Sequence, residues 1–72
     1  MKYPNEEEII REVERGTRSL RAAKKLFEAE LFEDAISRCY YAILHAAKAV
    51  LLIENVKVYS HEAVKRLFGM HL

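Results

Sequence analysis

The sequence predicts an all-α domain, in which an antiparallel helical hairpin carries a short third helix across one end. Two long segments repeat apolar residues at helical spacings of three and four, and only a short turn separates them. A third, shorter segment begins after Ser60 and stops at Gly69, which are typical first and last signals of a helix. The 72 residues are enough for one domain, so we expect a single unit over residues 1–72.

The first long helix is expected from about Glu6 to about Ala29. Asn5 is a good N-cap, and three glutamates follow it at the positive end of the helix, with Glu8 close to a capping-box position. Residues that follow a four-three alternation predict the face that packs on another helix. They are Ile9, Val13, Gly16, Leu20, Ala23 and Phe27. A glycine inside a helix costs up to about 1 kcal/mol relative to alanine, so Gly16 indicates close approach of another backbone.

The second long helix is expected from about Glu33 to Ile53. Its centre, SRCYYAILHAAKAVLL from Ser37 to Leu52, is apolar on several sides but carries one polar stripe. The stripe consists of Arg38, Tyr41, His45 and Lys48, at spacings of three, four and three. Neither proline nor glycine marks the break between the two helices, near residues 30–32.

The rest of the chain is expected to form a loop and the third helix. Residues 54–59 (ENVKVY) are too few and too polar at their start for a helix. Ser60 is a suitable N-cap for a helix from His61 to Phe68, and Gly69 a suitable stop.

The amount of apolar surface predicts association. A single core of this size supplies only about 3–5 kcal/mol, and one cysteine cannot form an internal disulfide. We therefore expect a homodimer or higher oligomer that completes the helical bundle. Residues expected at the interface are Tyr40, Ile43, Leu44, Ala47 and Leu51. Cys39 is interpreted as a small buried apolar residue.

Composition and motifs exclude several classes of protein. Twelve Lys and Arg against eleven Asp and Glu leave almost no net charge, so any RNA site must be local. The acidic N-terminal segment is unlike a signal peptide, and charged residues interrupt the longest apolar stretch, so we expect a cytoplasmic protein without a membrane span. His61 and Glu62 begin like a zinc-protease motif, but Lys65 stands where the second histidine is needed. Neither a metal nor another cofactor is expected.

The region around Arg38 and His45 resembles the HEPN superfamily of prokaryotic helical-bundle proteins. The matching pattern is S-R-x-Y-Y-A-x-x-H-A-A-K-A-x-L, and the similarity extends over about residues 15–71, through AELFEDA before it and YSHEAVKRLFG after it. The resemblance implies a metal-independent, toxin-like ribonuclease in which Arg38 and His45 are catalytic, with the site at a dimer interface. It also implies a nucleotidyltransferase as a partner. HEPN proteins usually continue from the glycine at position 69 through another core helix, so the chain, ending in residues 70–72, is expected to be shortened.

The spacing of Arg38 and His45 has a geometric consequence. Seven residues correspond to about 10.5 Å of helix rise, and helical side chains lean toward the N-terminus. Arg38 therefore leans away from His45 of its own chain, and the two should converge only where two copies cross about a two-fold axis near Tyr41 and Ala42. In such a cleft Tyr41 could stack on a base of RNA or a nucleotide, and Lys48 could contact a phosphate.

Each of these residues also has a purely structural interpretation. Asp34 and Arg38 could form an ordinary i,i+4 pair, His45 could be a core histidine bonded to a carbonyl, and Lys48 could reach solvent. Three classes of function therefore stay open. They are a HEPN ribonuclease, a noncatalytic HEPN module that binds a nucleotidyltransferase or nucleotide through the same surface, and a tetratricopeptide-like interaction module.

Overall fold

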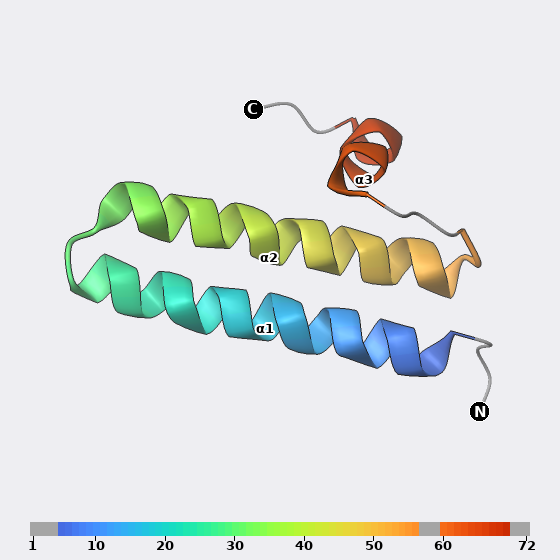
Figure 1. Ribbon diagram of the computed structural model, residues 1–72, viewed down its shortest axis with the longest axis horizontal. Helices are drawn as coiled ribbons and strands as arrows, with labels where there is room; N and C mark the ends of the chain where they lie inside the picture. The colour runs from blue at the N-terminus through green and yellow to red at the C-terminus, as the bar shows by residue number, and fades with distance from the viewer. Residues whose placement is uncertain (1–4, 57–59, 70–72) are drawn as a thin grey trace.

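A computed structural model describes residues 5–56 and 60–69 and contains three helices and no strand over those ranges. Helix α1 spans Glu6–Glu28, α2 spans Phe32–Ile53 and α3 spans His61–Phe68. Figure 1 shows α1 and α2 side by side in opposite directions, with α3 lying across α2 on the side away from α1. The predicted all-α hairpin with a short third helix is therefore confirmed.

The turn between α1 and α2 is made without glycine. Glu30 takes the left-handed conformation, with φ of 61°, and its N–H donates to the carbonyl of Phe27. The next N–H, of Leu31, donates to the carbonyl of Leu26 at 2.8 Å, which completes a Schellman motif. This hydrogen bonding ends α1 at Glu28 and starts α2 at Phe32, each one residue before the expected position.

The same motif ends α2. Asn55 has φ of 60°, and the N–H of Val56 donates to the carbonyl of Leu51 at 2.7 Å. Asparagine tolerates this conformation better than most residues. The chain therefore leaves the helix after Ile53, as expected, and residues 57–59 of the predicted loop lie outside the described residues.

The predicted caps are confirmed in α3 but not in α1. The Ser60 hydroxyl accepts from the N–H of Ala63, and Gly69 ends α3 with φ of 64°. Asn5 precedes α1, but its side chain makes no capping hydrogen bond. Instead its amide donates to the Asn55 side chain at 3.3 Å and to the Leu52 carbonyl at 3.5 Å. The expected cap is thus used to tie the start of α1 to the end of α2.

The face of α1 that meets α2 is rotated from the expected one. The buried and half-buried positions are Asn5, Glu6, Ile9, Glu12, Gly16, Ser19, Ala22, Ala23 and Leu26. Val13, Leu20 and Phe27, expected in this contact, are exposed instead. The reason is close approach. A Cβ placed on Gly16 would lie 3.4 Å from the Ala42 carbonyl oxygen and 3.5 Å from the His45 Cβ, so the contact has room for small side chains only.

The side of α2 opposite to this contact packs against α3. Leu44, Ala47 and Val64 form the buried cluster, with Tyr40 and Leu51 packed against it. Four of the five residues expected at a homodimer interface are therefore covered within the chain, because α3 lies on them. Only Ile43 of that set is exposed.

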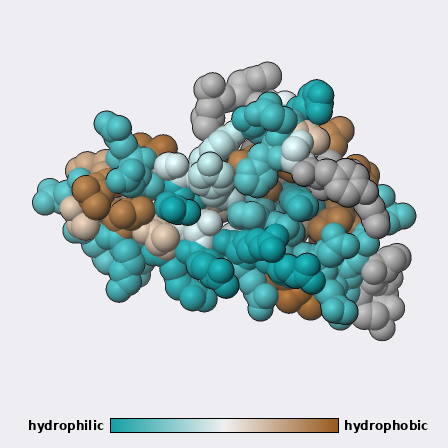
Figure 2. All heavy atoms as spheres, viewed as in Figure 1, coloured by the Kyte–Doolittle hydropathy of each residue, from teal (hydrophilic) through white to brown (hydrophobic). Residues whose placement is uncertain are grey.

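A third side of the hairpin is apolar and open. Its groove, of about 600 Å³, is lined by residues of both long helices, among them Leu20, Phe27, Phe32, Ile36 and Cys39. Cys39 is exposed, so its interpretation as a buried residue is wrong. Figure 2 shows hydrophobic residues gathered at the end of the hairpin where α1 turns into α2. We call this surface the apolar face.

Helix α2 is long enough to cross a membrane. Within its 22 residues, an 18-residue window has a mean hydropathy of 1.3. The expectation that no stretch is long and apolar enough for a membrane span is therefore wrong by length and composition. Core helices of water-soluble proteins pass the same test, and α2 packs on α1 along one side and on α3 along another. Length and composition alone therefore do not place this helix in a bilayer.

Candidate functional site

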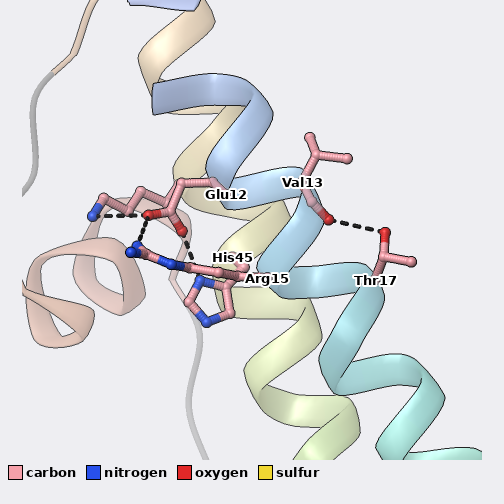
Figure 3. A network of polar contacts seen from close by, with 6 residues as sticks. Glu12, Val13, Arg15, Thr17 and His45 are labelled. Atoms are coloured by element: carbon pink, nitrogen blue, oxygen red, sulfur yellow. Dashed lines mark hydrogen bonds and ion pairs between the residues drawn. The ribbon is translucent and has the colours of Figure 1, made fainter. Parts of the chain in front are cut away.

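The candidate site is built around Glu12, a glutamate on the buried side of α1. Its side chain is almost fully buried and accepts from three directions. His45 Nδ1 lies 2.6 Å from Oε2, while Arg15 Nη1 and Lys48 Nζ lie 3.0 and 3.2 Å from Oε1. Figure 3 shows Glu12 of α1 and His45 of α2 directed toward each other. We call Glu12, Arg15, His45 and Lys48 the Glu12 cluster.

The charges of the cluster keep Glu12 ionised. Burial by itself raises the pKa of Glu12, but the hydrogen bonds from His45 and Lys48, with the positive charge of Lys48, outweigh it. The pKa of Glu12 therefore lies below its ordinary value of 4.5. One carboxylate faces two permanent cations, so the cluster retains a net positive charge even when His45 is neutral.

The structure brings two of the four predicted site residues together. His45 and Lys48 both bind Glu12. Tyr41 lies nearby, because its ring and that of His45 each lie 5.7 Å, between centroids, from the ring of His61. Arg38 is exposed and forms no ion pair or hydrogen bond with any described residue. The pair with Asp34 that the sequence allowed is therefore not formed. Arg38 and His45 of one chain are thus not in contact, as their spacing predicts.

The surroundings of His45 differ from those of a sealed core histidine. Its side chain is 18% exposed, and its partner is a carboxylate, not a backbone carbonyl. No described residue bonds to Nε2. His45 therefore has one ring nitrogen held and the other open.

Three residues of the site were not recognised from the sequence: Glu12, Arg15 and His61. Glu12 follows Ile9 by three and precedes Gly16 by four, so it shares their buried face. A charged residue at the spacing of buried residues was the signal in the sequence that could have identified Glu12. His61 is the first residue of a predicted helix, but nothing local indicated that α3 would bring it to His45.

The space for a second copy of α2 is restricted. Ala42, at the expected crossing point, faces Gly16 of α1 and is not free. Tyr41 is exposed. Helix α1 therefore blocks a crossing at Ala42 itself, whereas Tyr41 beside it is open.

Among the described residues, no group of three or more His, Cys, Asp and Glu side chains could hold a metal ion. The carboxylate of Glu12 is instead paired with nitrogen atoms of Arg15, His45 and Lys48. The arrangement suits proton transfer by a histidine next to positive charge.

Comparison with known proteins identifies the family. The HEPN domain model matches residues 10–72. The chain is 46% identical over 65 residues to "Putative toxin MJ0605" and 30% identical over 69 residues to "Putative toxin MJ0142", both of Methanocaldococcus jannaschii. It is 38% identical over 65 residues to "UPF0332 protein PH1297" of Pyrococcus horikoshii. These alignments cover 90%, 96% and 90% of this chain, respectively. This chain belongs to the HEPN family, and the tetratricopeptide alternative is set aside.

The matches cover 48%, 46% and 46% of the three relatives in the same order, so the chain spans about half the length of the curated relatives it matches. No solved structure matches the chain significantly.

Proposed function

We propose that this chain is a subunit of a toxin-like, metal-independent ribonuclease with His45 as a proton-transfer residue. The observation that supports this proposal best is the 2.6 Å contact between Glu12 Oε2 and His45 Nδ1. A carboxylate at Nδ1 favours the tautomer with its proton on that nitrogen and leaves Nε2 as an acceptor. A histidine in this state can take the proton of a ribose 2′-hydroxyl.

Positive charge around His45 suits an RNA phosphate. Arg15 and Lys48 both lie on Glu12, and together they exceed its charge by one. Lys48, predicted to contact substrate, is already paired, so its contribution is to the local potential. Arg38 is the cation left for direct phosphate binding, since its planar fork fits two phosphate oxygens.

Completion of the site requires a second copy. Arg38 leans away from His45 of its own chain, so we place Arg38 of the partner subunit opposite His45 across a two-fold axis beside Tyr41. In this arrangement Tyr41 is close to the bound RNA and available for stacking on a base. The whole of residues 1–72 acts as one HEPN-like domain in this dimer.

The biological setting is part of the same proposal. The relatives whose names describe putative toxins support a toxin-like role. A nucleotidyltransferase is the partner that we propose, as the family resemblance of the sequence implies. We place the protein in the cytoplasm, where its RNA substrate is found.

Cleavage of a labelled RNA in the presence of EDTA tests the proposal. His45→Ala should abolish cleavage, because a proton-transfer group contributes about 10²–10⁴-fold. Arg38→Lys should also lose most of the activity, whereas Arg18→Lys, on the exposed side of α1, should retain it. Equal cleavage by wild type and His45→Ala would refute the proposal.

Mixing variants tests the shared site separately. Arg38→Ala and His45→Ala chains are each inactive alone, but a mixed dimer holds one site with both native residues. Random mixing should therefore restore roughly a quarter of wild-type activity, because half the dimers are mixed and each has one intact site of two. No recovery in a mixture shown to exchange subunits would exclude a site shared in this way.

A noncatalytic binding module is the second candidate, favoured by the engagement of Lys48 and Arg15 with Glu12, which makes a fixed cationic surface. In that case a nucleotide such as ATP should shift the NMR signals of the His45 ring without being turned over. Cleavage that depends on His45 would decide against this alternative.

A further inference from the structure

His61 is placed beside the Glu12 cluster by a different part of the chain. It is the first residue of α3, and its ring centroid lies 5.7 Å from that of His45, with the two planes at 86°. The ring of Tyr41 lies 5.7 Å from it on another side. His61 itself is exposed to solvent. Two histidines, from α2 and α3, therefore lie edge to face beside each other within a single chain.

The position of His61 is fixed by the packing of α3. Val64, one turn further along the helix, is fully buried against Leu44 and Ala47. The Ser60 hydroxyl caps the first turn by accepting from the N–H of Ala63 at 3.1 Å. A buried anchor on one side of His61 and a cap on the other hold the start of the helix, and therefore the imidazole, near α2.

The two histidines differ in how their rings are held. Nδ1 of His45 is held by Glu12, so of the two neutral tautomers the one with its proton on Nδ1 and an accepting Nε2 is favoured. His61 has no hydrogen bond to a described residue and faces solvent. Hydrogen bonds of about 2.8 Å from a free nitrogen of each ring would reach two oxygens of one phosphodiester group lying alongside the pair.

We propose that His61 is the general acid that works with His45 as the general base, so that one chain supplies both proton-transfer groups. This inference rests on the ribonuclease activity proposed above. It leaves to the partner subunit only the charge of Arg38.

The proposed step balances without another reactant. Nε2 of His45 takes the proton of the 2′-hydroxyl, and the 2′-oxygen forms a bond to phosphorus. The bond from phosphorus to the 5′-oxygen breaks, and protonated His61 gives its proton to that oxygen. The products are a 2′,3′-cyclic phosphate and a free 5′-hydroxyl. Exchange with water then returns each histidine to its starting state.

The leaving group provides a test that a structural role of His61 would not pass. An ordinary RNA linkage releases an alkoxide and needs an acid, whereas a uridine 3′-phosphodiester of 4-nitrophenol releases a stable phenolate and does not. With the full chain, His61→Ala should slow cleavage of RNA by about 10²-fold or more. The same variant should retain activity on the nitrophenyl ester within roughly tenfold of wild type. His45→Ala should lose both activities, since both reactions need the base.

Controls separate folding from chemistry. Glu62→Gln alters the next residue of α3 and its pair with Lys65, yet should leave both activities unchanged. His61→Gln keeps a polar side chain of similar length, and should behave like His61→Ala if its circular dichroism and melting temperature match those of wild type.

The outcomes distinguish this inference from the proposal on which it rests. If His61→Ala and His61→Gln cleave RNA as fast as wild type, or lose activity on RNA and on the nitrophenyl ester equally, His61 is not the general acid. The proposed role of His45 is unaffected by that result. If wild type has no cleaving activity, or His45→Ala retains it, the ribonuclease proposal fails and the role of His61 fails with it.

Discussion

Two sides of α2 show opposite relations between residue type and burial. On one side, a charged residue is buried: the glutamate at position 12, brought there by α1, is 3% exposed and surrounded by donors. On the other, the apolar face leaves Ile36 68% and Phe27 62% exposed. Hydrophobicity alone would predict the reverse. We conclude that the contact between α1 and α2 is organised by small residues and a polar cluster.

The physical basis of this difference is the distance between the helices. Gly16 allows α1 to approach Ala42 closely, so large side chains are excluded from the contact. Leu20 and Phe27 consequently point to the groove of the apolar face. A buried carboxylate is tolerated at Glu12 because three donors offset its loss of water. The same three donors create the positive environment of the candidate site.

The largest expected effect is on RNA cleavage, which should respond to a change beside the candidate site but not to one on the apolar face. Tyr41→Glu places a negative charge beside the site and the proposed two-fold axis, so RNA cleavage should fall by about 10²-fold, as for a misplaced site. Ile36→Glu, on the apolar face, should change cleavage by no more than about twofold. Sedimentation at several concentrations should show weaker self-association for Tyr41→Glu but not for Ile36→Glu. If Ile36→Glu also loses cleavage, the catalytic dimer uses the apolar face.

The second prediction compares stability. Glu12→Ala removes the acceptor shared by His45 and Lys48 and should lower the free energy of unfolding by about 2–3 kcal/mol. Leu20→Ala, at a side chain that is 57% exposed, should cost only about 0.5 kcal/mol. Urea denaturation at low protein concentration measures both. A larger cost for Leu20→Ala would mean that the apolar face is covered in solution.

The third prediction concerns acid. Because the folded-state pKa of Glu12 is lowered, its contribution to stability is present above its ordinary pKa of 4.5 and is lost as the pH falls through the folded-state value. Wild type should therefore be more stable than Glu12→Gln at pH 6. This difference should shrink toward zero as the pH falls below 4.5 and through the folded-state pKa of Glu12. A difference that stays constant down to pH 2 would contradict an ionised, stabilising Glu12.

The smallest effect is expected at Gly16, which lies between the two sides. In Gly16→Ala, the gain in helix propensity of about 1 kcal/mol should be offset by the contact of the new methyl group with Ala42. The net change in unfolding free energy should stay within about 1 kcal/mol. The NMR signals of His45 should shift, since its Cβ lies 3.5 Å from the added carbon, whereas those of Ile36 should not. A loss of several kcal/mol would show that the helices cannot separate even slightly.

The sequence by itself determined the helices, since periodicity, Ser60, Gly69 and the acidic start of α1 are local signals that act within a few residues. It also placed Arg38, Tyr41, His45 and Lys48 on one side of α2, because the helical repeat fixes which residues share a face. Only the tertiary structure decided which of two overlapping faces of α1, the one with Glu12 or the one with Val13, packs on α2. Glu12 and Val13 lie one position apart, and the close approach at Gly16 selects the first.

The same limit applies to the site. Thirty-three residues separate Glu12 from His45, and no local pattern connects them. His61 reaches the cluster because Val64 anchors α3 on Leu44 and Ala47, a contact between distant segments. Local sequence was therefore enough to identify His45 as a histidine capable of proton transfer. The carboxylate that orients it and the second imidazole beside it depend on how the helices pack.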